Sequence, residues 1–361
     1  MFTFKQVRQN LTGAGLGHGI LELENGYIIV TERGGRILGP FRDEDETPSL
    51  NWLNPVLADS AALDLFLARN DWNLGGDRIW LAPEIHYMFR DRANPEASYL
   101  LPPEMDPGTW QLSAEGSAVL KLEQNMALGA YVTGPVNPLP REFKVSRTIS
   151  SIPDPLRLFP QYNELRQEVS FAGYRQTVEL SQTSEGDGLS AAWSLIQLNS
   201  GGEVYVPLVR PVQPTLYILP DGPGDTHLAF GEGYSKLKID GKHCYKVGFN
   251  SGYLTGRVAY LNREDAQNGY LLIRSYFNNP SEEYIEEPSH LPGYRGDSAF
   301  IYNDSGELGA FGELECQGGT VEGAPGKQTA TDTLLLWAYW GPLSRLYRIA
   351  QQLLQINIEV R

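Results

Sequence analysis

The chain has 361 residues, with 29 Lys and Arg against 44 Asp and Glu, which gives a formal net charge of −15. It therefore lacks the excess of basic side chains that neutralises phosphates in non-specific nucleic-acid binding, and its charge disfavours anionic membranes. Apolar residues at 41% and charged residues at 20% are typical of a globular protein with a sizeable core. The composition thus argues against a disordered chain and against nucleic acid or membrane as partners.

The N-terminal sequence and the cysteines bear on the compartment. The first residues, MFTFKQVRQNLTGAGLG, lack the continuous apolar segment of a signal peptide, and no later stretch reaches the length of a membrane span. Two cysteines, Cys244 and Cys316, are too few for a disulfide framework or a zinc cluster, although one bridge between them stays open. We therefore expect a cytoplasmic protein with reduced thiols.

Near the start of the chain the sequence predicts few helices or strands. The glycines of GAGLGHG (13–19) do not fit the dinucleotide-binding fingerprint, because His18 stands where the third glycine belongs. We interpret this segment as a turn before the first strand, with His18 in a loop. The segment ADSAALDLFLARN (58–70) has a weak helical pattern.

Most of the chain reads as strands separated by glycine and proline. REFKVSRTIS (141–150) alternates apolar and polar residues, which is typical of a strand with one buried face. Further segments rich in aromatic and β-branched residues follow at 167–184, 189–198, 203–210, 214–219, 243–249, 269–277 and 331–340. They predict an all-β fold of long antiparallel strands.

A clear helical pattern occurs at the end of the chain. GPLSRLYRIAQQLLQI (341–356) spaces its apolar residues three or four apart after a Gly-Pro start, which predicts a short C-terminal helix. The sequence has no fixed-period repeat, and no linker or change in composition divides it. We expect one domain over residues 1–361.

Metal and cofactor chemistry has little support in the sequence. The acidic runs RDEDET (42–47) and SEEYIEEP (281–288) lack the spacing of a calcium loop and are typical of solvated loops. The five histidines, at 18, 86, 227, 243 and 290, are scattered singly, and the chain has no P-loop, G-x-S-x-G elbow or H-E-x-x-H helix. We therefore predict no metal and no cofactor, which leaves acid–base chemistry or binding.

Two stretches combine charges with a strand-like frame. In GGDRIWLAPEIHYMF (75–89), alternation places Trp80, Ala82 and Glu84 on the side of Arg78, provided that Pro83 does not bulge the strand. The guanidinium of Arg78 suits adjacent hydroxyls or a carboxylate, and a structural Arg78–Glu84 pair is the alternative.

In FGELECQGG (311–319), Glu313 and Glu315 share one face of a strand. Two neighbouring carboxylates repel each other, which raises a pKa and can create a general base. An exposed β surface is the alternative.

A third stretch combines an aromatic ring with an amide. In AAWSLIQLN (191–199), Trp193, Leu195 and Gln197 share one face. A ring that stacks on C–H groups and an amide that bonds to hydroxyls are a usual combination for gripping a sugar. A tryptophan of the core is the alternative.

Taken in order, these segments resemble a known superfamily. GGDRIW, the strand W-x-L-x-Q-L, the pair YKVGF and GRVAYLN, and GELECQG followed by TDTLLLW are similar to the galactose mutarotase-like superfamily, which includes the aldose 1-epimerases. The resemblance covers about residues 34–337, more in order and spacing than in identity. It implies a large antiparallel β super-sandwich with a carbohydrate cleft on its concave face.

The resemblance assigns roles to two residues. The epimerases have an early Gly-Asn-Arg-Ile-like segment whose Arg binds substrate, and GDRI at 76–79 matches it with Arg78. They also have a late Leu-Glu-Thr-Gln-like segment whose Glu is the general base. LECQ at 314–317 matches it, which makes Glu315 rather than Glu313 the expected base.

The sequence departs from the family at the general acid. The epimerases carry an Asn-His-x-Tyr-Phe-Asn-Leu-like segment whose His is the acid, and this chain has Trp193 there. His86 and Glu84 are the candidate replacements. Lys246 in CYKVGF is a further polar group expected in the cleft, with an ordinary exposed lysine as the alternative.

The sequence therefore predicts an epimerase-like isomerase that interconverts the anomers of a small-molecule carbohydrate by acid–base ring opening. The alternative is a carbohydrate-binding protein without turnover, in which Trp193 stacks on the sugar. A weaker third reading is glycosidic cleavage by Glu84 and Glu315 as paired carboxyl groups. The sequence indicates neither the sugar nor an oligomeric state.

Overall fold

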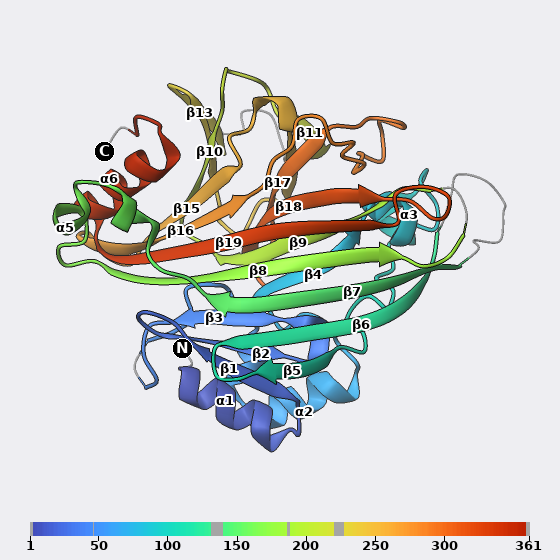
Figure 1. Cartoon of the computed structure of the whole chain (residues 1–361), viewed down its shortest axis with the longest axis horizontal. Coiled ribbons are helices and arrows are strands. Elements are labelled where there is room, and N and C mark those ends of the chain that lie inside the picture. The colour runs from blue at the N-terminus through green and yellow to red at the C-terminus, as the bar shows by residue number, and fades with distance from the viewer. Residues whose placement is uncertain (1–2, 46, 131–139, 186–187, 220–226, 359–361) are drawn as a thin grey trace.

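The architecture consists of two antiparallel sheets. The computed structural model describes residues 3–45, 47–130, 140–185, 188–219 and 227–358. Within these residues the strands form one sheet of nine strands and one of ten, which pack against each other (Figure 1). The predicted all-β fold with large antiparallel sheets is confirmed.

The first sheet contains the strands that carry most of the candidate residues. Its order is β1-β2-β3-β4-β9-β18-β17-β14-β11. The strands are β1 His18–Glu22, β2 Tyr27–Thr31, β3 Ile37–Phe41, β4 Asp77–Ala82, β9 Ser190–Asn199, β11 Thr215–Ile218, β14 Tyr245–Asn250, β17 Asp297–Asn303 and β18 Phe311–Val321.

The second sheet has the order β12-β13-β10-β15-β16-β19-β8-β7-β6-β5. Burial alternates along β6 and β7, because side chains on one face reach the core while those on the other meet solvent. The strands are β5 Gln111–Glu115, β6 Val119–Gly129, β7 Pro140–Ser151, β8 Ser170–Gln182, β10 Glu203–Pro207, β12 Leu228–Gly231, β13 Tyr234–Lys238, β15 Arg257–Arg263, β16 Asn268–Tyr276 and β19 Thr329–Pro342.

Helices cover parts of both sheets. The C-terminal helix α6 packs its apolar stripe on β15, β16 and β19, and the weaker helix predicted at 58–70 is α2, so both predictions are confirmed. The helices are α1 Phe4–Gly13, α2 Ser60–Ala68, α3 Glu84–Tyr87, α4 Pro95–Ser98, α5 Tyr162–Leu165 and α6 Leu343–Leu354, with the 3-10 turns η1 Arg33–Gly35, η2 Pro55–Ala58, η3 Pro155–Leu158 and η4 Ser251–Tyr253.

Helix α1 was not predicted. The side chain of Thr3 caps it by accepting a hydrogen bond from the backbone N–H of Gln6 at 3.4 Å. Phe4, Val7 and Leu11 form its buried stripe and pack with α2 on β2 and β3. Residues 14–17 after α1 form the expected turn, but His18 is the first residue of β1 rather than a loop residue.

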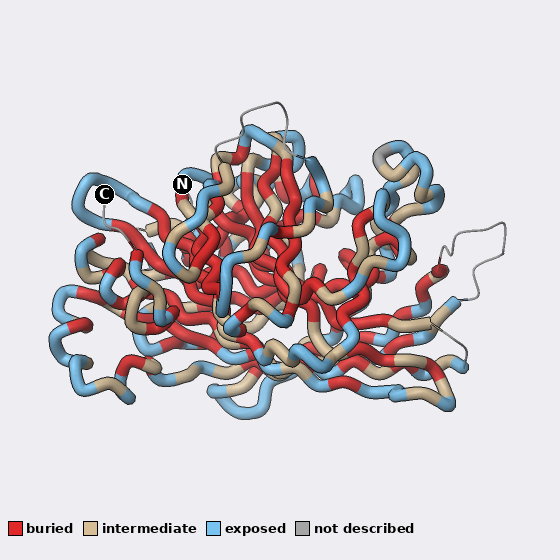
Figure 2. Tube along the Cα trace, turned by 90° about the horizontal axis from the view of Figure 1, so that it is seen from above, coloured by how far each residue is buried: buried red, intermediate tan, exposed pale blue. Residues whose placement is uncertain are grey.

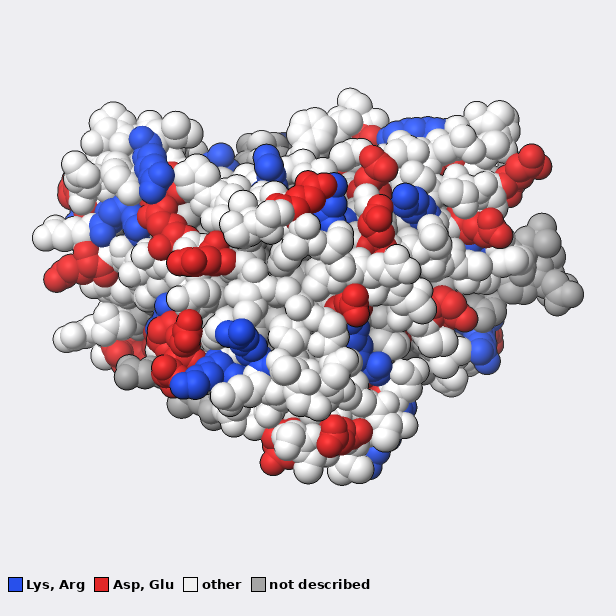
Figure 3. Space-filling view, turned by 60° about the horizontal axis from the view of Figure 1, so that its bottom comes forward, with Lys and Arg blue, Asp and Glu red and all other residues white. Residues whose placement is uncertain are grey.

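The main core lies between the sheets. Figure 2 shows buried segments through the middle of the molecule and exposed residues along the outer turns. Cys316 is buried in this core, Cys244 is half-buried, and both are free thiols. None of the helices in the described ranges is long and apolar enough to cross a membrane. On the face drawn in Figure 3, acidic and basic side chains are interspersed rather than gathered into one basic area.

A charged group is buried between the sheets at the start of β4. The carboxylate of Asp77 accepts hydrogen bonds from Arg274 at 2.6 Å and from Tyr174 and Gln176 at 2.8 Å each, all on the second sheet. Arg147 lies 3.9 Å away and also bonds to Gln176. Asp77 therefore ties β4 to the opposite sheet.

We expect Asp77→Ala to lower the free energy of unfolding by about 3–5 kcal/mol, because it leaves Arg274 buried without its carboxylate. Urea unfolding followed by fluorescence measures the change. Asp45→Ala is the control, since it breaks the exposed Lys5–Asp45 pair and should cost less than about 1 kcal/mol. Equal effects of the two substitutions would contradict a role for Asp77 in holding the sheets together.

Candidate active site

Alternate residues of β4 point to opposite faces of the first sheet: one face packs on the second sheet, and the other carries the candidate site residues. Asp77 faces the second sheet, so Arg78 and Trp80 face the other way, as alternation predicted. Residues directly opposite each other in neighbouring strands point to the same face, and Trp80 lies opposite Trp193 on β9. Arg78, Trp80 and Trp193 therefore all lie on the outer face of the first sheet, the face turned away from the second sheet.

The pairing of neighbouring strands places side chains of β18, β17 and β14 on the same outer face. Gln197 on β9 lies opposite Glu313, and Glu315 lies opposite Phe300 on β17. Lys246 on β14 lies opposite Tyr302, which in turn lies opposite Glu313. Strands far apart in sequence therefore place Arg78, Trp193, Gln197, Lys246 and Glu315 on one face.

Arg78 pairs with Glu313 and not with Glu84. Its Nη2 lies 2.8 Å from Glu313 Oε1, and its guanidinium lies 4.0 Å from the centre of the Trp80 ring. Both Glu313 and Glu315 are buried, at 5% and 1% exposed. The Arg78–Glu84 pair and the exposed β surface, considered as alternatives, are therefore wrong.

Lys246 is the centre of a second charged group. Its Nζ lies 3.0 Å from Glu84 Oε2, 3.5 Å from Glu315 Oε2 and 4.3 Å from the centre of the Trp193 ring. It is only 5% exposed, so the alternative of an ordinary exposed lysine is wrong. Burial lowers the pKa of Lys246, but Glu315, Glu84 and Glu286 together raise it above its ordinary value and keep the ammonium charged.

Glu315 titrates near neutrality in this setting. Burial raises its pKa to about 7, opposed by Lys246 and assisted by the negative charges of Glu313 and Glu84. A carboxyl group with this pKa exchanges a proton readily at neutral pH, as a general base requires. The role of Glu315 as a base stays a prediction, and its buried position beside Lys246 is compatible with it.

Glu286 is a site residue that the sequence did not reveal. Its carboxylate accepts a hydrogen bond from the backbone N–H of Glu84 at 2.8 Å, and its own N–H donates to Gln317 Oε1 at 3.1 Å. Its pKa is raised to about 8: burial is the largest cause, the carboxylates of Glu84 and Glu315 add to it, and the charge of Lys246 opposes it. The residue belongs to the acidic run at 281–288, whose composition pointed to a solvated loop.

The two sequence-based candidates for the acid lie on α3, because the strand ends at Ala82 and Pro83 begins the helix. Glu84 turns toward Lys246. His86 is half-buried, and burial lowers its pKa to about 4. The charges that act on His86 are those of Arg141, Glu287, Arg295 and Arg92, whereas those that act on Glu315 are Lys246, Glu313, Glu84 and Arg78.

Trp193 is buried, 1% exposed, and belongs to the main hydrophobic core cluster, as the alternative of a core tryptophan expected; aromatic rings and Lys246 enclose it. Its ring makes edge contacts with Trp80 and Phe300, at centroid distances of 6.2 and 6.4 Å. Several buried polar atoms on this face have no hydrogen-bond partner among the residues that the structure describes: Arg78 Nε and Nη1, Trp193 Nε1, Gln197 Oε1 and Nε2, and Gln317 Nε2. Such atoms are costly to bury, and a ligand rich in hydroxyl groups could satisfy both the donors and the acceptor.

The fold and this cluster define a two-sheet β protein with buried acid–base groups on the outer face of one sheet. The chain belongs to the family of unknown function DUF6786, whose model matches residues 20–360. A search of the curated proteins found no match.

Three solved structures match most of this chain at low sequence identity. A provisionally assigned aldose 1-epimerase from Escherichia coli K12 matches with 13% identity and a TM-score of 0.48, over 90% of this chain and 100% of that chain. A galactose mutarotase related enzyme from Lactobacillus acidophilus matches with 7% identity and a TM-score of 0.49, over 89% and 96%. A 4-alpha-glucanotransferase from Thermococcus litoralis matches with 8% identity and a TM-score of 0.33, over 92% of this chain and 41% of that chain.

The raised pKa of Glu315 predicts a pH-dependent effect of Glu315→Gln on stability. A raised pKa means that the folded state holds the proton more tightly, so this contribution is present below about pH 4.5 and is lost as the pH rises through about 7. The substitution removes this loss, so the stability of the variant relative to wild type should increase between about pH 5 and about pH 8, by on the order of 3 kcal/mol.

Urea unfolding at the two pH values measures this difference. Glu307→Gln, at an exposed position, is the control and should show the same pH dependence as wild type. A difference between Glu315→Gln and wild type that does not change with pH would mean that the Glu315 pKa is not raised.

Proposed function

We propose that this protein is a carbohydrate-active acid–base catalyst that interconverts the anomers of a free sugar, as an aldose 1-epimerase does. The observation that carries the proposal is the buried Glu315 carboxyl, with its pKa raised to about 7, beside the Lys246 ammonium at 3.5 Å. The position of Glu315 in the LECQ segment, which resembles the epimerase base segment, supports the same role.

The reaction needs two proton transfers. Glu315 takes the proton of the anomeric hydroxyl while an acid protonates the ring oxygen. The bond between C1 and the ring oxygen then breaks to give the open-chain aldehyde. Rotation about the C1–C2 bond and reversal of both transfers close the ring as the other anomer. Arg78 binds sugar hydroxyls through Nε and Nη1, the donors that its pair with Glu313 leaves free.

Glu286 is the acid that the charges around Lys246 favour. An acid must hold its proton at the working pH, and the raised pKa of about 8 keeps the carboxyl of Glu286 protonated at neutrality. The pKa of His86, lowered to about 4, keeps its imidazole neutral there. Glu84, the other candidate from the sequence, lies in the same group through its contact with Lys246. In this scheme Lys246 stabilises whichever carboxylate is charged.

A sugar-binding protein without turnover is the second candidate. It is favoured by Trp193 at the position of the epimerase acid and by the unpartnered amides of Gln197 and Gln317. In that case the same face would bind a sugar through hydroxyl hydrogen bonds alone. A measurement of turnover distinguishes the two functions.

We expect the wild-type protein to accelerate the exchange between the α and β anomers of at least one free sugar, measured by NMR exchange spectroscopy over a panel of neutral and acidic sugars. Glu315→Gln and Glu286→Gln should each reduce the accelerated rate by about 10²–10⁴-fold, since each removes one proton-transfer group. His86→Gln should retain the activity, and Glu307→Gln is the matched surface control.

Three outcomes would change the proposal. Loss of activity in His86→Gln with retention in Glu286→Gln would identify His86 as the general acid. Loss in Glu84→Gln with retention in Glu286→Gln would assign it to Glu84. Sugar binding seen as line broadening, without accelerated exchange for any sugar, would contradict catalysis and leave the binding function.

We also expect a bell-shaped pH dependence of kcat/KM. The base must be deprotonated, so activity should fall as the pH drops below about 7, the pKa of Glu315. The acid must be protonated, so activity should fall as the pH rises above about 8, the pKa of Glu286. Residual activity of Glu286→Gln should lack the alkaline fall. An alkaline fall that persists unchanged in this variant would rule out Glu286 as its source.

A further inference from the structure

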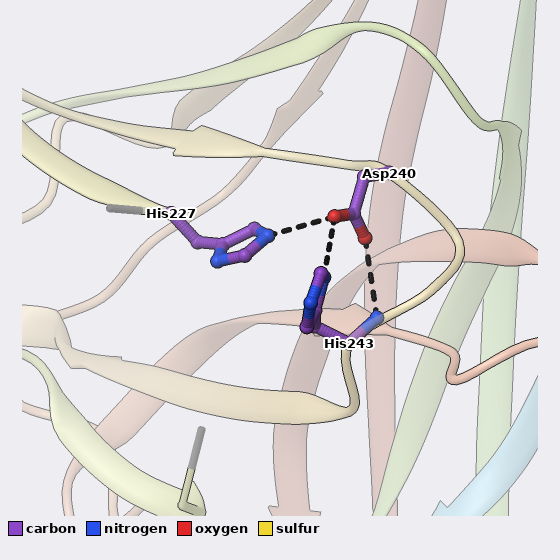
Figure 4. A group of neighbouring side chains, drawn as sticks. All are labelled: His227, Asp240 and His243. Atoms are coloured by element: carbon purple, nitrogen blue, oxygen red, sulfur yellow. Dashed lines mark hydrogen bonds and ion pairs between the residues drawn. The ribbon is translucent and has the colours of Figure 1, made fainter. Parts of the chain in front are cut away.

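Two histidines that lie 16 residues apart in sequence meet at one carboxylate. His227 precedes β12, and Asp240 and His243 lie in the connection from β13 to β14. Asp240 Oδ2 lies 2.8 Å from His227 Nε2 and 2.7 Å from His243 Nδ1 (Figure 4). All three atoms lie within 4.8 Å of one another. Neither histidine belongs to the candidate active site.

The carboxylate is held in position by its other oxygen. Asp240 Oδ1 accepts hydrogen bonds from Asn303 Nδ2 at 2.8 Å and from the backbone N–H of Lys242 at 2.9 Å. Asn303 also donates to the carbonyl of His243 and accepts from the N–H of Gly241, so it fixes the whole turn. Oδ2 is thereby directed at the two imidazoles, an arrangement like the hydrogen-bonded carboxylates that ligate metals.

We propose that His227 Nε2, His243 Nδ1 and Asp240 Oδ2 bind one divalent first-row transition ion, with zinc as the ion of best fit. Two imidazoles and one carboxylate are a common three-ligand set for such ions, with the remaining position left for water. Oxygen-seeking ions such as Ca²⁺ and Mg²⁺ fit poorly, because two of the three donors are nitrogen.

The geometry needs only a small adjustment. Zinc bonds of about 2.0–2.1 Å at tetrahedral angles hold ligand atoms about 3.4 Å apart, against the present N···O distances of 2.8 and 2.7 Å. The side chain of His243 is 49% exposed and can turn, while those of His227 and Asp240 are 13% exposed. Each coordinating nitrogen must give up its bond to Oδ2, and its proton moves to the other ring nitrogen or to solvent.

A bound ion would join elements that belong to different sheets. It would connect the residue before β12, at one edge of the second sheet, to the turn that enters β14 in the first sheet. His243 lies three positions before Lys246 on the same segment. The proposed ion is therefore a structural clip at the entry to β14 and is separate from the acid–base groups.

The test is titration of the metal-free full-length protein with ZnCl₂ by calorimetry, and with CoCl₂ by visible absorption, whose d–d bands report nitrogen ligation. We expect one ion per chain and a higher melting temperature with zinc. His243→Ala should abolish stoichiometric binding. Asn303→Ala, which leaves the three ligands in place but removes the bonds that hold Asp240 and its turn, should weaken binding by about 10–100-fold. His290→Ala, at an exposed histidine, is the matched control and should bind as wild type does.

His243→Gln serves as a second variant, and circular dichroism verifies that each variant is folded. Binding that is absent in wild type for zinc, cobalt, nickel and manganese, or equal in wild type and both His243 variants, would overturn the proposal. Zinc binding that disappears only in His290→Ala would overturn it as well, since it would place the ion elsewhere.

Discussion

The carboxylate of Asp77 is the group on which the geometry of the site depends. It is buried between the sheets and bonded to Arg274, Tyr174 and Gln176, and an uncompensated charge there would be costly. Because side chains alternate along a strand, an inward Asp77 makes the next residue, Arg78, point outward. The pairing of β4 with β9, and of β9 with β18, then carries this parity to Glu313 and Glu315.

The outer face of the first sheet has the opposite charge balance. Around Asp77 the cations Arg274 and Arg147 outnumber the carboxylate, and the cluster joins the two sheets. Around Lys246 the three carboxyl groups of Glu84, Glu286 and Glu315 outnumber the ammonium. One cation cannot neutralise all of these carboxyl groups, and burial raises the pKa of Glu315 to about 7 and that of Glu286 to about 8. That surplus is the physical source of the acid–base chemistry that we propose.

Local patterns predicted the parts of the site that lie on regular strands. The period of two placed Arg78 with Trp80, Trp193 with Gln197, and Glu313 with Glu315, and each pair shares a face in the structure. Alternation could not predict where side chains in loops and helices lie, because tertiary contacts determine which residues they meet. This is why Glu286 was missed and why Glu84, although displaced from the strand by Pro83, still reaches Lys246.

The same limit explains the histidines, whose scatter in sequence argued against a metal. His227 and His243 approach because β12 and β13 form a hairpin, and the chain then turns at Asp240 to enter β14. The three clusters differ in what surrounds the carboxylate: excess cations around Asp77, excess carboxyl groups around Lys246, and imidazoles at Asp240. Excess cations stabilise the carboxylate of Asp77, and, in addition to burial, excess carboxyl groups raise the pKa values of Glu315 and Glu286. In our proposal, the imidazoles at Asp240 replace their hydrogen bonds to the carboxylate with bonds to a metal ion. The partners of each carboxylate, more than its burial, therefore separate the structural cluster from the two clusters for which we propose functions.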